Sequence, residues 1–496
     1  MFKTSDNDDS DAITAASLVG PVFCGSNTYY IDKITYIHNN LLFGNFVFGV
    51  NGSIAAIGID NIRVEGCSFY LNEFPELNSD NRGKWLLVLQ RCNGAIVSRC
   101  SFTHGVSSLY IDRCITAIVS NNIFKDMRQT SPRGNGYGVL LIESKSVLIN
   151  ANIFYDVARH AIYVSHDSTS TYNENIDISN NIFYHSEDNS GDDTGFEVPI
   201  NVRPAKKVII RNNYFENMFN IATFNRQDIS LGDETRGFVG SEDIYITKNI
   251  GKFKYTTRRD GVIFFSSSSD TELYPSTKNI IIDGNIVECE YGHFISADNF
   301  ENLIIVNNKV KFTETTLQAI VMVKMKRKDL LKDLYIKDNI FELNDGFLFN
   351  VDDFNPDVIE RTDYGNFEII NNKITGIRCI GRWNGRTQSL AAGVNSFNDV
   401  VIINNIFDFT HPRDYFSSPK IKRLYLNGNI ANTTHGLYIG QPDHQFSTDP
   451  IFTHYSAKGS NPGDAIPGSI NIFYTDNNNN NNNNNRTYIK TYNGWK

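Results

Sequence analysis

The sequence predicts an all-β fold, a right-handed parallel β-helix of about thirteen coils, and three observations lead to it. A pattern of eight to nine residues recurs along the chain, and its clearest copy is Asn175–Phe183. Apolar residues alternate within each copy with a period of two, which indicates a β-strand. The thirteen copies lie 22 to 36 residues apart. Repeats at this spacing are typical of stacked architectures.

One position in every copy is nearly constant, and we call it the anchor. It is cysteine in the first two copies and asparagine in the other eleven: Cys67, Cys100, Asn122, Asn152, Asn181, Asn213, Asn249, Asn285, Asn308, Asn339, Asn372, Asn405 and Asn429. We expect the anchors to stack inside the coils as a ladder, each amide bonding the next. Each coil should then rise by one strand spacing, about 4.8 Å. A β-sandwich with asparagine turns is the alternative.

Composition limits the classes of function. The chain has 496 residues and a net charge of −9, which argues against a nucleic-acid partner. No apolar run is long enough to span a membrane, and Met1–Asp6 does not open an apolar signal region. The seven cysteines are odd in number, so we expect buried free thiols rather than a Cys67–Cys100 bond.

The elements follow in order along the chain. Residues 1–40 are expected to form an N-terminal cap and entry strands, with a short helix over 8–17 that covers the first coil. Residues 41–445 should form the parallel β-helix. Residues 446–496 should form a small C-terminal β segment with an asparagine-rich loop, since two alternating stretches, 469–474 and 487–492, flank the asparagine run 477–485.

The entry segment carries a resemblance. The Asp-rich helix and the strand, turn and strand of Gly20–Ile31, which contains Thr28-Tyr29, resemble the entry to pectate-lyase-like β-helix domains, where an Asp-rich helix leads to a glycine turn and a strand ending in Thr-Tyr. Phage tailspike and capsule-depolymerase proteins are similar in this respect. The resemblance covers about residues 8–440 in architecture, and it implies a virion-tail or extracellular protein that acts on a polysaccharide. Many tailspikes carry a head-binding domain ahead of the repeats; we expect this chain either to be a trimmed form of such a protein or to dock on another component.

A second strand in each coil supplies the candidate site. Aligning Leu109–Asp112, Leu140–Glu143, Ile162–Ser165 and Ile200–Arg203 predicts four residues inside the coil: Ile111, Ile142, Val164 and Val202. One outward column then holds Tyr110, Leu141, Tyr163 and Asn201. The next outward column holds Asp112, Glu143, Ser165 and Arg203. Arg159, His160, His166, Asp167 and Glu197 lie beside these strands.

Two kinds of sugar chemistry fit these residues. Hydrolysis needs two carboxyl groups, for which we predict Asp112 and Glu143, with Asp167 nearby. β-Elimination needs a base, for which His160, His166 or Tyr163 is the candidate, and an arginine that neutralises a uronate carboxyl, for which Arg159 or Arg203 is available. The segment Arg159–Ile162 looks like an Arg-His-Gly-Ile segment of uronate-acting β-helix enzymes, with alanine replacing glycine. Tyr110, Tyr163, Arg159, His166, Glu197 and Arg203 are the predicted substrate-binding residues.

No cofactor or metal is predicted. No histidine or cysteine spacing matches a zinc site, and the aspartates at 188, 192 and 193 fit a solvated acidic loop better than a calcium site.

A mostly apolar strip four residues before the anchors predicts an interface or a surface covered by loops of the same chain. On the first interpretation the protein is a homotrimer.

The sequence therefore predicts a tailspike-like depolymerase that cleaves a bacterial capsular or surface glycan by hydrolysis or β-elimination. A non-catalytic glycan-binding or structural fibre protein is the rival hypothesis.

Overall fold

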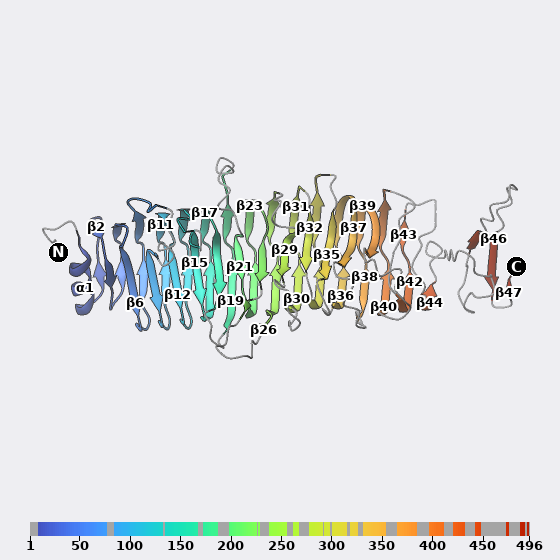
Figure 1. The fold of residues 1–496 in the computed structure, drawn as a ribbon, viewed down its shortest axis with the longest axis horizontal. Helices are drawn as coiled ribbons and strands as arrows, with labels where there is room; N and C mark the ends of the chain where they lie inside the picture. The colour runs from blue at the N-terminus through green and yellow to red at the C-terminus, as the bar shows by residue number, and fades with distance from the viewer. Residues whose placement is uncertain are drawn as a thin grey trace. The chain divides into compact units, whose positions relative to one another are not determined.

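The computed structural model describes residues 8–76, 84–131, 134–166, 172–186, 198–225, 227–228, 238–254, 261–266, 277–290, 292–297, 300–314, 318–325, 331–353, 365–383, 396–410, 420–431, 442–447, 473–475, 487–491 and 494–495. The chain divides into two compact units, residues 1–259 and 260–496. Both units consist of parallel strands that pair coil to coil, which confirms the predicted parallel β-helix (Figure 1).

Each coil of the first unit contributes up to three strands. The anchor strands precede the anchors: β1 (Val22–Phe23), β4 (Leu41–Leu42), β7 (Arg63–Glu65), β10 (Ile96–Ser98), β13 (Ile118–Ser120), β16 (Lys145–Asn150), β19 (Asn173–Ser179), β22 (Ala205–Arg211) and β27 (Glu242–Thr247). The second strands follow the anchors: β2 (Thr28–Ile31), β5 (Asn45–Phe48), β8 (Ser68–Leu71), β11 (Ser101–Gly105), β14 (Ile123–Met127), β17 (Ile153–Val157), β20 (Ile182–Tyr184), β23 (Tyr214–Met218) and β28 (Ile250–Phe253).

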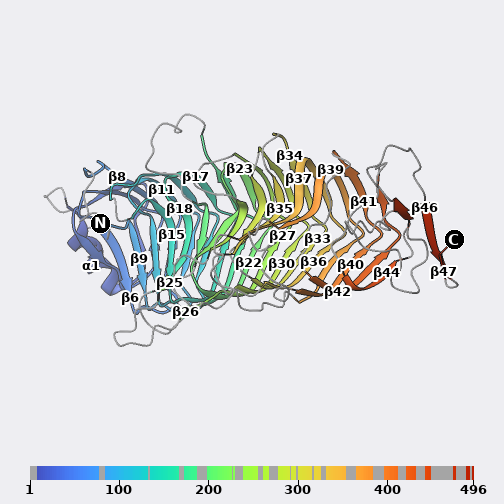
Figure 2. The same cartoon turned by 45° about the vertical axis from the view of Figure 1, so that its right-hand side comes forward.

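The third strands complete the coils of this unit: β3 (Ile34–Tyr36), β6 (Ser53–Ile57), β9 (Leu87–Gln90), β12 (Leu109–Asp112), β15 (Tyr137–Ile142), β18 (His160–Ser165), β21 (Ile200–Val202) and β24 (Ala222–Asn225). Figure 2 shows β8, β11 and β17 along one side of the unit, with β9 and β15 on the neighbouring face. A short antiparallel pair, β25 (Gln227–Asp228) and β26 (Phe238–Val239), lies outside these three sets.

The second unit repeats this arrangement. Its anchor strands are β30 (Thr277–Asp283), β33 (Phe300–Val306), β36 (Leu331–Lys337), β38 (Phe367–Ile370), β40 (Ser396–Ile403), β42 (Lys420–Asn427) and β44 (Pro442–Ser447). Its other strands are β29 (Gly261–Ser266), β31 (Ile286–Cys289), β32 (His293–Ala297), β34 (Lys309–Phe312), β35 (Ala319–Met325), β37 (Ile340–Asp353), β39 (Lys373–Trp383), β41 (Ile406–Phe409) and β43 (Ile430–Ala431). The long strand β37 pairs with both β34 and β35, so it runs through two faces of its coil.

The predicted capping helix is present as α1 (Ser10–Val19). It is tied to the first coil because Asp9 N–H donates to Tyr30 O at 2.7 Å and Tyr30 N–H donates to Asp9 Oδ2 at 3.0 Å. At the other end of the sequence, within the predicted C-terminal β segment, β45 (Phe473–Thr475), β46 (Thr487–Thr491) and β47 (Gly494–Trp495) form a small antiparallel sheet.

The anchor asparagines form the predicted ladder. Asn213 Nδ2 donates to Asn249 Oδ1 at 3.0 Å and to Ile178 O at 2.9 Å. Its Oδ1 accepts from the backbone N–H and the side-chain amide of Asn181, at 2.9 and 3.1 Å. The same bonds recur in the second unit, for example from Asn339 to Asn372. Each buried amide therefore satisfies backbone groups of its neighbours as well as another amide.

The residue before each anchor takes a left-handed backbone, with φ between 54° and 65°. Glycine and asparagine adopt this conformation at least cost, which explains the recurring Asn-Asn and Gly-Asn pairs. Two residues after the anchor, phenylalanines stack from coil to coil, with centroids 4.6 to 5.5 Å apart between Phe46, Phe69, Phe102, Phe124, Phe154, Phe183 and Phe215. The ladder and this stack fill the inside of the turn.

A second, mixed ladder was not predicted. Cys92 N–H donates to Cys114 Sγ at 3.3 Å, Cys114 N–H to Ser144 Oγ at 3.1 Å, and Ser144 N–H to Asn173 Oδ1 at 2.9 Å. Since the acceptor changes from coil to coil, no single residue type marks this corner. All seven cysteines are buried free thiols, as predicted.

Two apolar rows run along the outside of the coils. The predicted row four residues before the anchors is half-buried, and its members are in register, for example Ile118 with Leu148 and Ile281 with Ile304. A second row lies directly after the anchors and is more exposed: Ile123, Ile153, Ile182, Tyr214 and Ile250 in the first unit, and Ile286, Ile340, Ile406 and Ile430 in the second.

Candidate functional site

The third strands bring together the predicted outward column that contains Tyr110, Tyr163 and Asn201. The register predicted for this column is wrong at one residue. Tyr110 pairs with Leu140, Leu140 with Tyr163, and Tyr163 with Asn201. The prediction that Leu141 occupies this column is wrong, because Leu141 pairs with Ile111 and is fully buried. Residues 139–142 are four consecutive apolar residues, so alternation does not reveal which of them face inward.

The same shift removes Glu143 from the predicted carboxylate column. Asp112 pairs with Ile142, and Ile142 pairs with Ser165. The prediction that Ile142 points inside is therefore also wrong. Glu143 is the next residue, beyond the end of β15, and its backbone is left-handed with φ of 45°.

Asp112 and Glu143 are nevertheless joined through Arg113. Arg113 Nε donates to Glu143 Oε2 at 3.0 Å, and its Nη1 lies 3.5 Å from Asp112 Oδ2. Gln90 Nε2 also donates to Asp112 Oδ2, at 2.6 Å. Only 3% of each carboxylate side chain is exposed. One guanidinium thus compensates two nearly buried charges, as buried carboxylates require.

His160 is held on both sides of its ring. Its Nδ1 lies 3.1 Å from Val198 O, and its Nε2 lies 3.0 Å from Asn201 Nδ2. Because the carbonyl only accepts and the amide nitrogen only donates, these contacts assign the neutral tautomer with the proton on Nδ1. Asn225 Nδ2 in turn donates to Asn201 Oδ1 at 2.8 Å, which fixes the orientation of the Asn201 amide.

Two arginines lie over tyrosine rings on adjacent coils. The Arg159 guanidinium carbon is 5.6 Å from the centroid of Tyr137, and that of Arg203 is 5.4 Å from the centroid of Tyr163. The two tyrosine rings are 5.4 Å apart. We call Tyr137, Arg159, Tyr163 and Arg203 the arginine–tyrosine strip. Cations at this distance are attracted to the ring face. Both arginines are half-buried, and they give the strip two positive charges.

The segment before β15 packs against this strip. Asn135 Oδ1 accepts from the backbone N–H groups of Thr130 and Ser131, at 2.8 and 3.2 Å, and its Nδ2 donates to Thr130 Oγ1. A Cβ added at Gly134 would fall on Arg159 Nη1 and 2.7 Å from the Tyr137 hydroxyl. Gly134 has φ of +111°, a backbone conformation that favours glycine.

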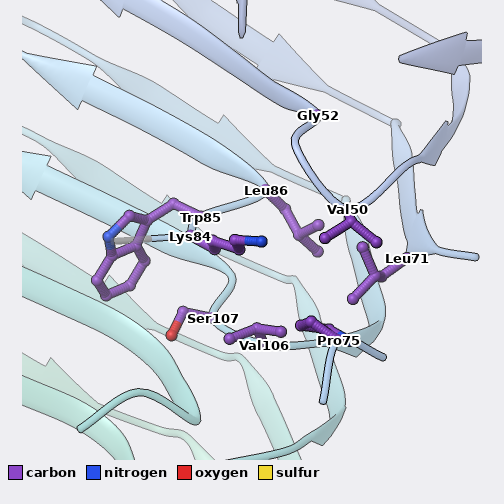
Figure 3. Close-up of a pocket in the computed structure, with 9 residues that line it drawn as sticks. All are labelled: Val50, Gly52, Leu71, Pro75, Lys84, Trp85, Leu86, Val106 and Ser107. Atoms are coloured by element: carbon purple, nitrogen blue, oxygen red, sulfur yellow. The ribbon is translucent and has the colours of Figure 1, made fainter. Parts of the chain in front are cut away.

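Trp85 joins the strip to a pocket. Its ring lies 5.2 Å from Tyr110 and 5.9 Å from Tyr137. It also lines a mostly apolar pocket together with Val50, Gly52, Leu71, Pro75, Lys84, Leu86, Val106 and Ser107 (Figure 3). In Figure 3 the Lys84 amine extends toward Leu86, and the Trp85 ring lies on the opposite side of Lys84.

Two predicted site residues, Asp167 and Glu197, lie outside the described residues, as do the aspartates at 188, 192 and 193. His166 is buried. The described part of the chain contains no group of three or more His, Cys, Asp or Glu side chains placed to hold a metal ion. In that same part, no helix is long and apolar enough to cross a membrane.

Sequence reasoning placed Asn201 in the outward column but missed Arg113, Tyr137, Trp85 and Asn225 as members of the site. Tyr137 could have been found from the register, because it pairs with His160. Arg113 and Trp85 lie outside their strands, next to β12 and β9, so strand periodicity does not place their side chains.

Comparison with known proteins agrees with the fold. A family model for a right-handed β-helix region matches residues 81–231. Together with the parallel pairing of the strands, this match confirms the predicted right-handed parallel β-helix. A comparison with curated protein sequences returned no match.

Solved structures of low sequence identity resemble the chain. PfbA, a surface adhesin of Streptococcus pneumoniae, is 14% identical; the alignment covers 81% of this chain and 88% of the adhesin, with a TM-score of 0.41. The catalytic unit of a GH87 α-1,3-glucanase from Streptomyces thermodiastaticus is 12% identical, with 81% and 66% covered and a TM-score of 0.41. A tailspike protein mutant of E. coli bacteriophage HK620, in complex with a pentasaccharide, is 10% identical, with 86% and 74% covered and a TM-score of 0.47.

Proposed function

We propose that this protein binds and cleaves an acidic polysaccharide of the bacterial surface. The arginine–tyrosine strip carries the proposal. Arg159 and Arg203 lie on adjacent coils, and a guanidinium binds a carboxylate through two parallel hydrogen bonds. Tyrosine adds an apolar ring and a polar hydroxyl, a combination suited to sugars. Since equivalent positions repeat about every 4.8 Å, the strip can follow a polymer along the coils.

The arrangement supports β-elimination over hydrolysis. In β-elimination a base takes the proton from the carbon beside the sugar carboxyl, a carbon–carbon double bond forms, and the glycosidic C–O bond breaks as its oxygen gains a proton. Arg203 would bind the carboxylate, and Tyr163, whose ring lies under Arg203, would accept that proton on its oxygen while its own hydroxyl proton passes to the glycosidic oxygen. Hydrolysis needs two available carboxyl groups, whereas Asp112 and Glu143 both engage Arg113.

The second candidate is a glycan-binding fibre protein without catalysis. The contacts of His160 favour it, because both ring nitrogens already lie within hydrogen-bonding distance of Val198 and Asn201. A histidine engaged in this way is a positioning residue for the tyrosine rings beside it. On this hypothesis the strip binds the polymer and leaves it intact.

The test uses purified acidic and neutral capsular polysaccharides. We expect the viscosity of an acidic substrate to fall and the ultraviolet absorbance of unsaturated products to rise. Arg203→Gln should weaken binding and slow cleavage. Arg211→Gln is the matched control, since Arg211 makes an exposed ion pair with Asp177 on another face of the coil. Binding without any fall in viscosity would favour the fibre hypothesis, and no binding to any acidic glycan would refute the proposal.

We also propose that the protein acts as a homotrimer, outside the cell or on a virion tail. The two apolar rows beside the anchors support an assembly, since large apolar side chains recur there from coil to coil.

A further inference from the structure

The second strands of the first unit carry a column of outward residues that the proposed function does not use. It runs in register through Tyr70, Thr103, Lys125, Tyr155, Tyr184 and Glu216. The residues that follow four of them, His104, Asp126, Asp156 and Asn217, have left-handed backbones with φ between 50° and 56°. We call these ten residues the outer tyrosine strip.

Aromatic and cationic groups are paired along this strip. The rings of Tyr155 and Tyr184 stack at 5.0 Å, and Lys125 Nζ lies 5.2 Å from the centroid of Tyr155. The Tyr70 ring stacks on His104 at 5.2 Å. Tyr70 is 39% exposed, and Lys125 is also exposed. Tyr155 and Tyr184 are half-buried.

Two carboxylates on adjacent coils are held in fixed positions beside the rings. Asp126 Oδ2 lies 2.8 Å from His104 Nδ1, and its Oδ1 accepts from Arg128 Nε at 3.1 Å. Asp156 accepts from Ser186 N–H and Ser186 Oγ, both at 2.8 Å. A carboxylate offers about four acceptor sites, so each retains acceptor capacity. Asp126 is one-third exposed, which leaves that capacity open to solvent.

Charges of both signs lie along the strip: Lys125 is positive, and Asp126, Asp156 and Glu216 are negative. Arg128 and His104 accompany Asp126, and Lys125 lies one position before it. Such a surface offers hydrogen-bond donors and acceptors without a strong field of one sign, whereas the arginine–tyrosine strip is positive. An uncharged ligand rich in hydroxyl groups fits the outer tyrosine strip, and an anionic ligand fits the arginine–tyrosine strip.

We infer that the outer tyrosine strip is a second carbohydrate site, which takes a neutral, hydroxyl-rich segment of the glycan. The inference rests on the proposed function and specifies its substrate class: a heteropolysaccharide with both acidic and neutral sugars. The two strips belong to the same coils, because only two residues separate Asp156 of one strip from Arg159 of the other. One polymer can therefore contact both strips.

The test measures binding of the full chain to a panel of neutral and acidic oligosaccharides from bacterial capsules. The double variant Tyr155→Ala/Tyr184→Ala should weaken binding of neutral oligosaccharides by roughly tenfold or more, and leave binding of isolated acidic sugars unchanged. Arg203→Gln should have the opposite selectivity. Tyr36→Ala, at an exposed tyrosine of β3, is the matched control, and circular dichroism confirms that each variant is folded.

The outcomes separate the two proposals. Neutral binding that is insensitive to the double variant overturns this inference, while acidic binding lost in Arg203→Gln still supports the proposed function. Loss of neutral binding in the double variant, with acidic binding intact, supports both. An unaltered chain that binds neither class overturns both.

Discussion

Arg113 Nε lies 3.0 Å from Glu143 Oε2, and this contact joins equivalent positions of adjacent coils, one residue beyond the paired Asp112 and Ile142. Arg113 follows β12 and Glu143 follows β15, so the ion pair lies at the corner of the coils rather than on the face of a strand. Because Asp112 shares the same guanidinium, one residue supports two nearly buried carboxylates.

Replacing Arg113 with methionine should therefore destabilise the protein strongly. The substitution leaves two buried carboxylates without their cation, and breaking a buried pair commonly costs about 3–5 kcal/mol. The free energy of unfolding from urea titration measures this. Arg211→Met is the control, because Arg211 and Asp177 form an exposed pair whose loss should matter much less. Equal effects of the two substitutions would contradict the structural role of Arg113.

Asn213→Leu tests the anchor ladder. It removes the acceptor of the Asn181 N–H and side-chain amide, and the donor to Ile178 O and Asn249 Oδ1. We expect a cost of about 1–3 kcal/mol for each group left unsatisfied, measured as a lower melting temperature. Asn93→Leu, at an exposed asparagine, should change the melting temperature little. An unchanged melting temperature for Asn213→Leu would refute the role of the ladder.

His293 in β32 predicts a pH dependence of stability. Burial lowers its pKa from 6.5 to about 4, so between these values the unfolded chain binds a proton that the folded chain does not. The contribution of the neutral His293 to the free energy of unfolding is therefore fully present above pH 6.5. About 3 kcal/mol of it is lost as the pH falls to 4. In His293→Asn the free energy of unfolding should vary less over this range. Parallel pH profiles of the two proteins would contradict the prediction.

The two apolar rows predict where copies of the chain would meet. Ile281→Lys/Ile304→Lys places charge in the predicted row, and Ile286→Lys/Ile340→Lys places it in the more exposed row. We expect a trimer by sedimentation, and its dissociation in the variants whose row lies in the interface. Lys311→Ala is the control at an exposed position. A monomeric unaltered protein at micromolar concentration would end the trimer hypothesis.

The proposed catalytic role is tested at Tyr163 of the arginine–tyrosine strip. If Tyr163 is the base, Tyr163→Phe should lower turnover at least ~10²-fold, because the ring and the overlying Arg203 remain while the hydroxyl is lost. Tyr110→Phe is the control, since Tyr110 lies in the same outward column two coils away. If instead His160→Ala, Asp112→Asn or Glu143→Gln alone abolishes turnover in a folded protein, the assignment of the base is wrong.

The repeat itself could be predicted because its physical causes are local. The left-handed residue and the buried anchor occupy fixed places in every copy, and a phenylalanine stands two residues after the anchor in eight of the thirteen copies, because the same turn recurs in each coil. Alternation in the anchor strands then gives their inward and outward faces, as Ile176 and Ile178 show.

The candidate site depended on tertiary structure. In β15 the residues Val139, Leu140, Leu141 and Ile142 are apolar on both faces, because Tyr137, Leu140 and Tyr163 pack into a cluster on the outside of the coil. The alternation of apolar and polar residues is therefore absent from β15. Without it, the sequence does not show which residue of β15 pairs with Asp112 of β12. Arg113 and Glu143 approach each other at a corner, where the path of the backbone rather than the spacing of residues sets the direction of a side chain.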